Sequence, residues 1–313
     1  MKSGEIFLSL PCFYLLPGGE EIMKAITIDH ERCTLCGLCV KTCVRRILQK
    51  RGNKIICTEP DRCIFCGHCK AVCPVDAPQV ASYRAEEFVP VPARENYPLP
   101  DDLLAFFRVR RSLRVYKKKP VERKKIEKII QAGRFAPTGG NRQHIEYVVI
   151  QNPDKFIEIR NTAINILKYQ ADEVAQAIAD RRAAGKPTLE KHVLAERYVR
   201  TWQDMYSLHK KGVDRLFYNA QALIVCHFAP MGGISEVVDS GLASMQMVLM
   251  AEALGLGTCF IGLLAIAAEK SPALKEAMGI PKKHVIPVIF TLGYPAVHYE
   301  RLVSRRLAQV KWI

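Results

Sequence analysis

Glu31-Arg32-Cys33-Thr34-Leu35-Cys36-Gly37-Leu38-Cys39-Val40-Lys41-Thr42-Cys43 is followed thirty residues later by Asp61-Arg62-Cys63-Ile64-Phe65-Cys66-Gly67-His68-Cys69-Lys70-Ala71-Val72-Cys73. Four cysteines, an arginine, a glycine and an acidic position coincide between the two stretches. A match at a fixed period indicates an internal duplication. Each copy has the spacing Cys-x-x-Cys-x-x-Cys-x-x-x-Cys, which concentrates eight of the twelve cysteines in two short segments.

This spacing is the bacterial pattern for iron–sulfur clusters, so the sequence predicts two [4Fe–4S] clusters. Three thiolates, each separated from the next by two intervening residues, wrap one face of a cluster. The fourth, expected to start a helix, reaches the neighbouring cluster. One ligand set is Cys33, Cys36, Cys39 and Cys73, and the other is Cys63, Cys66, Cys69 and Cys43. The alternative is a pair of zinc sites, but these usually carry paired Cys-x-x-Cys knuckles. Gly37 and Gly67 are expected to relieve crowding near the inorganic sulfide.

Residues 24–85 resemble two-cluster bacterial ferredoxins, which implies a ferredoxin-like domain over residues 23–85. Pro74 follows Cys73 as that family's pattern expects, whereas Val44 follows Cys43 and departs from it. Between the motifs lie five basic residues, Arg45, Arg46, Lys50, Arg51 and Lys54. They form either a docking face for an acidic electron donor, such as ferredoxin or flavodoxin, or a solvated loop.

The bulk properties fit two domains in a reducing compartment. The chain has 313 residues, and its clustered cysteines indicate metal binding in the cytoplasm and not disulfides. A formal net charge of +15 suggests an anionic ligand or partner, but no nucleic-acid reader motif is present. The apolar stretch from Gly241 to Ala268 contains Glu252 and a glycine-rich break, which favours a buried helix and a turn over a membrane span.

The first 22 residues are expected to be a translated leader or a disordered extension. Gly18-Gly19-Glu20-Glu21 can be encoded by a purine-rich ribosome-binding site, and Met23 follows at a suitable distance. We therefore expect the working protein to start at Met23.

A proline-rich stretch, residues 86–101, predicts a linker to a second domain over residues 102–313. A basic run follows, and Arg110, Arg111, Ser112 and Arg114 within it suit a phosphate dianion, because arginine presents paired donors. After a predicted helix over Glu122–Arg134, the turn Ala136-Pro137-Thr138-Gly139-Gly140-Asn141-Arg142-Gln143 offers backbone and amide donors.

These motifs, with Gly255-Leu256-Gly257-Thr258-Cys259-Phe260-Ile261-Gly262 and Leu292-Gly293-Tyr294-Pro295, resemble the FMN-dependent nitroreductase family over residues 102–309. The resemblance implies an α+β fold with a central mixed sheet flanked by helices, and a homodimer with FMN at its interface. It departs from the family at His144-Ile145, where Pro-Trp is common, and at Ile261, where no acidic residue precedes Gly262.

The resemblance also implies roles for individual residues. It gives Arg110, Arg111, Ser112 and Arg114 to the FMN phosphate and the nearby ring edge, with Arg305 and Arg306 closing on the phosphate. It gives Ile261, Gly262 and Leu263 to the ring near N5. The turn residues that reach the flavin bound mainly by the other subunit are Pro137, Thr138, Gly139, Asn141 and Gln143. The sequence identifies no catalytic proton donor.

The remaining pattern predicts apolar strands at 147–150, 222–226 and 285–290, with a long helical region from Asp154 to Lys211 broken near Gly185. Clusters carry single electrons and FMN can release a hydride equivalent. The fusion thus predicts an oxidoreductase that moves electrons from a low-potential donor to a small organic acceptor such as a nitroaromatic, quinone or enone. The alternatives are a redox sensor or electron carrier without turnover, and other flavin chemistry such as dehalogenation or flavin breakdown.

Overall fold

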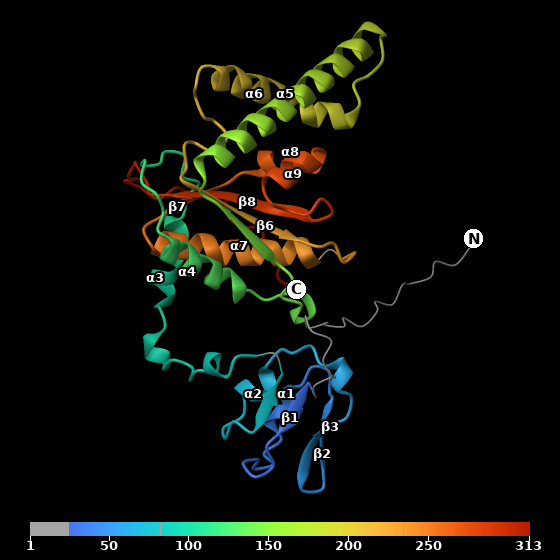
Figure 1. Cartoon of the computed structure of the whole chain (residues 1–313), viewed down its shortest axis with the longest axis vertical. Coiled ribbons are helices and arrows are strands. Elements are labelled where there is room, and N and C mark those ends of the chain that lie inside the picture. The colour runs from blue at the N-terminus through green and yellow to red at the C-terminus, as the bar shows by residue number, and fades with distance from the viewer. Residues whose placement is uncertain (1–24, 82, 234) are drawn as a thin grey trace, which may run out of the picture. The chain divides into compact units, whose positions relative to one another are not determined.

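The structure of the chain is a computed structural model that describes residues 25–81, 83–233 and 235–313. The described residues form two compact units (Figure 1). The first unit comprises the described chain up to Tyr97 together with Gly140–Arg142, and the second comprises the rest. The predicted leader, residues 1–22, lies outside the described residues.

The first unit is built from two small antiparallel sheets and two short helices. Its elements are β1 (Ile26–Ile28), α1 (Leu38–Thr42), β2 (Leu48–Arg51), β3 (Lys54–Cys57), α2 (His68–Ala71) and β4 (Pro78–Val80), with 3-10 turns at Pro60–Arg62, Ala85–Glu87 and Arg94–Asn96. Strand β1 pairs with β4, and β2 pairs with β3. Gly52 and Asn53 join β2 to β3 as a two-residue hairpin connection, and Gly52 supplies the positive φ of 57° that such turns favour.

The duplication is visible in the backbone as well as in the sequence. Three pairs of residues thirty positions apart have left-handed φ: Leu35 and Phe65 at 58° and 50°, Gly37 and Gly67 at 76° and 72°, and Arg46 and Asp76 at 54° and 53°. Gly37 and Gly67 precede α1 and α2 as their N-cap residues. Their left-handed backbone gives a direct reason for glycine at both positions.

The helices of this unit lie before the fourth cysteines and not after them. Cys39 lies within α1 and Cys43 is the residue that ends it, while Cys69 lies within α2 and Cys73 follows. The expectation that the fourth cysteine starts a helix is therefore wrong. In each motif the left-handed glycine after the second cysteine redirects the chain. The helix therefore begins before the third cysteine and ends before the fourth.

The second unit is an α+β domain, as predicted. Its elements are α3 (Pro100–Val109), α4 (Arg123–Arg134), β5 (Glu146–Ile150), α5 (Pro153–Ala183), α6 (Glu190–Lys210), β6 (Ala222–Phe228), α7 (Ser235–Ala253), β7 (Gly257–Phe260), α8 (Gly262–Lys270), α9 (Pro272–Ala277) and β8 (Val285–Gly293). The strands pair antiparallel in the order β5-β6-β8-β7, and a parallel bridge joins Ser112 to Thr258.

Helices cover both faces of this sheet. Strand β6 is buried along its whole length, and its side chains alternate between two cores. Leu223 and Val225 pack in the core formed with α5, α6, α8 and α9, whereas Ile224 and Cys226 pack in the core formed with α4 and α7. Figure 1 shows these two groups of helices on opposite sides of the sheet.

One predicted helix-and-turn segment contains an additional strand. Helix α7 ends at Ala253, and the chain then forms β7 before α8 begins. At the start of β7 an added Cβ on Gly257 would lie 2.3 Å from Leu113 Cδ2, so only glycine leaves room for Leu113. Among the described residues, every helix is too short or too polar to cross a membrane.

Candidate functional site

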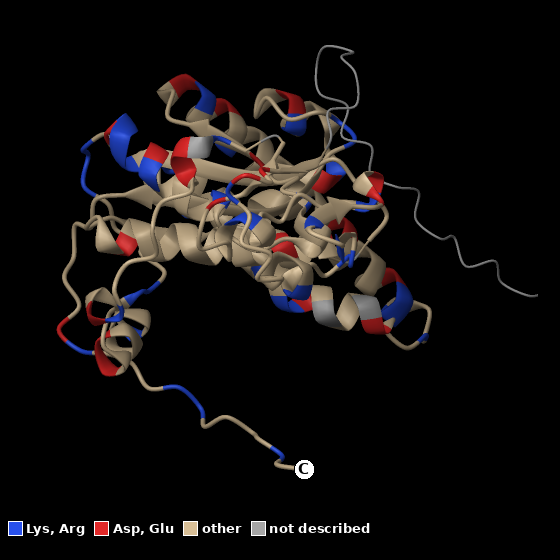
Figure 2. Ribbon diagram, turned by 90° about the horizontal axis from the view of Figure 1, so that it is seen from below, with Lys and Arg blue, Asp and Glu red and all other residues tan. Residues whose placement is uncertain are grey.

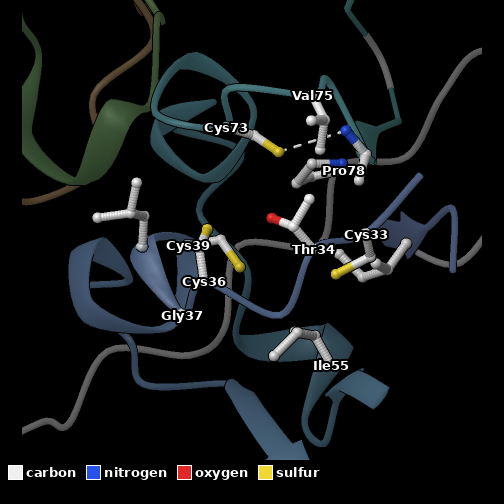
Figure 3. A pocket seen from close by; sticks show the side chains of 12 residues that line it. Cys33, Thr34, Cys36, Gly37, Cys39, Ile55, Cys73, Val75 and Pro78 are labelled. Atoms are coloured by element: carbon white, nitrogen blue, oxygen red, sulfur yellow. Dashed lines mark hydrogen bonds between the residues drawn. The ribbon is translucent and has the colours of Figure 1, made fainter. Parts of the chain in front are cut away.

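The first unit contains a cavity lined by four of the motif cysteines. Cys33, Cys36, Cys39 and Cys73 surround it together with apolar residues that include Ile28, Ile55 and Val75. Figure 3 shows that these cysteines come from two separate segments, with Cys73 approaching from the second motif.

A second cavity is lined by the other four motif cysteines, Cys43, Cys63, Cys66 and Cys69. The fourth cysteine of each motif therefore lines the cavity formed by the other motif. The structure thus brings together the two ligand sets that the spacing predicts.

The environment of the sulfur atoms disfavours the charged thiolate form of the unbound cysteines. Burial raises the pKa of Cys69 to about 12 and also raises the pKa values of Cys39 and Cys63, and neighbouring cysteines add to the effect. All eight are free cysteines without disulfide bonds. Thiolates crowded in a low-dielectric cavity require a bound cation core, and iron supplies one. The donor set fits a cluster at each cavity.

Backbone N–H groups already point at two of these sulfur atoms. The Phe65 N–H donates to Cys63 Sγ at 3.4 Å, and the Ala77 N–H donates to Cys73 Sγ at 3.3 Å. Lys70 is buried beside Cys69, and its ammonium group lies 2.5 Å from Asp76 Oδ1. Hydrogen bonds to sulfur favour the reduced state of a cluster, whereas Asp76 offsets the positive charge of Lys70.

In the second unit, the predicted phosphate-binding residues lie on an extended segment along the edge of the sheet. The Leu113 N–H donates to the Thr258 carbonyl at 2.8 Å, next to the bridge between Ser112 and Thr258. Further along, the Lys117 N–H donates to the Tyr294 carbonyl at 2.9 Å. The segment is therefore held against β7 and the end of β8.

Alternation along this segment separates the basic side chains. Burial raises the pKa of Cys259, but Arg114, Ser112 and Arg110 all lower it, which places these three side chains around one thiol. Arg111 points elsewhere: its guanidinium lies 4.4 Å from the centre of the Tyr299 ring and lines a separate cleft of about 370 Å³. Arg110, Ser112 and Arg114 therefore lie on one side of the segment, near Cys259, and Arg111 lies on the other side.

The glycine-rich turn is anchored on α7. The Gly139 N–H donates to Asp239 Oδ2 at 2.9 Å, and the Gln143 N–H donates to Thr138 Oγ1 at 3.0 Å, while Pro137 is exposed. Within the first unit, Asn141 Nδ2 donates to the Phe65 carbonyl at 2.8 Å and to the Ile64 carbonyl at 3.1 Å. The Asn141 amide is therefore engaged by the loop of the second cysteine motif.

The start of α8 presents an open helix N-terminus. Ile261 is buried and its N–H donates to the Ile289 carbonyl at 2.8 Å, whereas Gly262 is exposed and a Cβ there would meet nothing within 4 Å. Helix N-termini leave N–H groups without intrahelical partners. Gly262 and the half-buried Leu263 therefore offer donors that a planar ligand can approach closely.

Arg305 and Arg306 lie in an exposed C-terminal segment. Residues 302–313 have no regular secondary structure, and Figure 2 shows this extended stretch with basic residues along it. Among the described residues, neither guanidinium forms an ion pair. The closing of Arg305 and Arg306 on the phosphate therefore stays a prediction.

Two buried acids were not predicted from the sequence, and one of them, Asp239, accepts the hydrogen bond from the glycine-rich turn. Glu236 is 1% exposed and Asp239 is 4% exposed, and both lie on α7. Their spacing of three residues in the first turns of a largely apolar helix is a signal that would have singled them out, because buried acids need partners.

Comparisons with known proteins agree with these two units. Residues 107–294 match the model described as "Nitroreductase family", and residues 25–74 match the model described as "4Fe-4S dicluster domain". Both resemblances drawn from the motifs are thereby confirmed, and the second match favours iron–sulfur clusters over zinc.

Individual relatives match about two thirds of the chain or slightly less. A protein of Archaeoglobus fulgidus that is named NADH dehydrogenase/NAD(P)H nitroreductase is 26% identical over 199 residues, which are 62% of this chain and 86% of the relative. An NADH dehydrogenase of Thermus thermophilus is 26% identical over 195 residues, 60% of this chain and 83% of the relative. A solved nitroreductase with bound FMN from Desulfitobacterium hafniense has a TM-score of 0.49 and 20% identity, covering 66% of this chain and 97% of its own.

Proposed function

Because the chain belongs to the nitroreductase family and also carries a 4Fe-4S dicluster domain, we propose that it is an iron–sulfur flavoprotein oxidoreductase. Electrons enter from a low-potential donor, pass through two [4Fe–4S] clusters to FMN, and leave to a small organic acceptor such as a nitroaromatic, quinone or enone. The observation that carries this proposal is the division of eight cysteines between two four-sulfur cavities on the same chain as the nitroreductase domain. A family member that took electrons only from a nicotinamide would not need these clusters.

Arg110, Ser112 and Arg114 would hold the FMN phosphate. They share one face of an extended segment, and two guanidinium groups beside a hydroxyl match a phosphate dianion. The N–H groups at the start of α8, at Gly262 and Leu263, would donate to the edge of the ring. When bound, FMN exchanges one or two electrons and so joins single-electron carriers to two-electron chemistry.

The second unit also has apolar surface that fits a second copy of the chain. Val238, Leu242 and Met245 on α7 are exposed and follow the helical spacing of one stripe. On α3, Leu104 and Phe107 are exposed as well. Exposed apolar patches of this kind mark protein interfaces. They support a homodimer, in which Pro137, Thr138, Gly139, Asn141 and Gln143 of one subunit would serve the flavin of the other and Arg305 and Arg306 would close on the phosphate.

The positive charge of the first unit supports an acidic protein as the electron donor. The β2–β3 hairpin presents Lys50, Arg51 and Lys54, and the preceding Arg45 and Arg46 are exposed too. An acidic protein such as ferredoxin or flavodoxin would be attracted to this surface. The names of the two relatives point instead to NADH or NAD(P)H, so the donor must be tested directly. Oxygen-sensitive clusters and unpaired thiols support a location in the cytoplasm.

The test compares donors and cysteine variants under anaerobic conditions. Turnover of a nitroaromatic or a quinone is measured with reduced ferredoxin and separately with NAD(P)H. Removing one cluster ligand with Cys73→Ala should abolish most of the ferredoxin-driven rate. Cys57→Ala is the matched control, because Cys57 is a half-buried cysteine that lines neither cavity.

The outcomes separate the proposal from its rivals. If Cys73→Ala supports ferredoxin-driven turnover as well as Cys57→Ala does, electrons do not pass through the cluster and the proposal is wrong. If the loaded protein binds a partner only in one redox state and turns over no acceptor with any donor, it is a redox sensor. An anaerobic optical titration of the same protein counts flavin and clusters and gives their order of reduction.

A further inference from the structure

Three side chains with metal-binding atoms meet at one end of the sheet in the second unit. They are Glu146 at the start of β5, His227 near the end of β6 and His284 just before β8. One ligand atom from each lies within 4.8 Å of the others. These residues and the predicted phosphate site lie at opposite ends of β8. The strand begins beside His284 and ends at Gly293, which pairs with Gly257 near the phosphate site.

The strand register forces these residues together. Glu146 and His227 are directly opposed partners in the β5–β6 ladder, so their side chains project from the same face of the sheet. His284 precedes Val285, which pairs with Phe228 on the other side of β6. Two of the ligands therefore come from the neighbouring strands β5 and β6, and the third comes from the residue that leads directly into β8.

A β-bulge gives His284 its direction. The register between β6 and β8 shifts between Cys226 and Phe228, so that one extra residue of β8 stands opposite His227. Pro287 lies in this stretch and has no N–H to contribute to the ladder. Bulges re-aim side chains and occur next to functional sites. The Lys275 ammonium also donates to the His284 carbonyl at 2.7 Å, which holds the chain as it enters β8.

The spacing of the donor atoms suits a shared ion. The Nδ1 atoms of His227 and His284 are 2.9 Å apart, a contact that requires at least one of them to be unprotonated. Two nitrogens bound to one zinc ion at about 2.0–2.1 Å lie about 2.9 Å apart at a right angle and about 3.4 Å apart at the tetrahedral angle. Glu146 Oε1 is 3.8 Å from His284 Nδ1, so a small side-chain rotation completes the set.

We propose that Glu146, His227 and His284 form a binding site for a divalent first-row transition ion, with two imidazoles and one carboxylate as protein ligands. This donor set suits zinc and its neighbours better than calcium or magnesium, which prefer oxygen. His227 is buried and Glu146 is exposed, so water occupies the remaining positions on the open side. The ion joins the ends of β5, β6 and β8 and stabilises the folded second unit, since it binds the folded and not the unfolded chain.

The test uses cluster-loaded protein so that the motif cysteines are occupied. The protein is freed of loosely bound ions with a chelator, and Zn²⁺ uptake is followed anaerobically by calorimetry. Two ligand variants, His284→Gln and Glu146→Gln, avoid the fully buried His227. Glu158→Gln is the matched control, because Glu158 is an exposed glutamate on α5 and is not one of the three proposed ligands. X-ray absorption at the zinc edge identifies the ligands.

The wild type and Glu158→Gln should each bind about one Zn²⁺ and unfold at a higher temperature with it. His284→Gln should lose roughly 10- to 100-fold or more in affinity, since even loss of a partner that supports a ligand has that effect. Imidazole scattering should appear in the zinc spectrum. Equal Zn²⁺ affinity in the wild type and His284→Gln, or a spectrum dominated by sulfur, would overturn the proposal.

Discussion

Arg111 differs from its neighbours because an extended chain sends successive side chains to opposite sides. Arg110, Ser112 and Arg114 face Cys259, whereas Arg111 lies against Tyr299. The sequence presents the four as a single polar run, and the resemblance assigns all of them to the phosphate. The bridge between Ser112 and Thr258 and the hydrogen bond from the Leu113 N–H show that the run is extended, which divides its members between two sides.

This division predicts that the two arginines have different effects on flavin binding. Arg114→Ala should weaken FMN affinity by roughly 10- to 100-fold, because it removes a hydrogen bond to a charged phosphate. Arg111→Ala should change FMN affinity by only about twofold, because its guanidinium lies against the Tyr299 ring and does not contact the phosphate. Fluorescence titration of flavin-free protein measures both. Equal losses in the two variants would show that Arg111 also reaches the phosphate.

Other residues show where the sequence suffices and where it does not. The cysteine ligand sets could be predicted because the known pattern with this spacing assigns the fourth cysteine to the neighbouring cluster, although the helix expected to follow that cysteine is absent from the described residues. The engagement of Asn141 with the Phe65 carbonyl could not, since those residues are far apart in the sequence and share no motif. The contact of Gly139 with Asp239 is equally long-range.

Helix α7 supports the glycine-rich turn through Asp239 and also presents an exposed apolar face. One face packs under the sheet with Met247 and Val248 fully buried, while Val238 is 55% exposed and Leu242 is 43% exposed on another face. A helix that is apolar on both faces has a second surface to bury. In the proposed homodimer, that surface contacts the partner subunit.

A charge in this stripe should therefore separate the subunits. Leu242→Glu is expected to shift the protein from dimer to monomer, because an unpaired carboxylate in an apolar interface loses its hydration. Val193→Glu on α6, at an exposed apolar residue outside the stripe, should leave the dimer intact. Light scattering after size-exclusion chromatography gives the mass of each. A dimer that persists in Leu242→Glu would place the interface elsewhere.

The longer elements could be predicted from periodicity, but β7 could not. The helix over 122–134 and the three long strands have clear apolar patterns, and the structure contains them. Strand β7 is only four residues long and begins with a glycine. Its pairing depends on β8 and on Leu113, which are distant in the sequence, so no local pattern reveals it.

At the scale of the whole molecule, the net charge of +15 should govern encounters with an anionic protein. Turnover driven by reduced ferredoxin at limiting concentration is expected to fall roughly tenfold between about 0.02 M and 0.5 M salt, because salt screens the attraction. Turnover driven by reduced methyl viologen, a cation, should not fall. Stopped-flow measurement of both rates tests this. A salt-independent ferredoxin rate would indicate that the basic hairpin does not steer the donor.

The crossing of Cys43 and Cys73 between the two cavities has a consequence for how such a unit could arise. One half alone has three sulfur atoms for its own cavity, and its fourth is aimed at a neighbour that is missing. Two copies of an ancestral half-length peptide could each have a complete ligand set only in a symmetric dimer, in which each copy supplies its fourth cysteine to the cluster of the other. Joining the copies end to end turns that exchange into an internal one. The fused chain still shows this exchange in its cysteine ligands. Separating its two halves would remove the fourth ligand from both clusters at once.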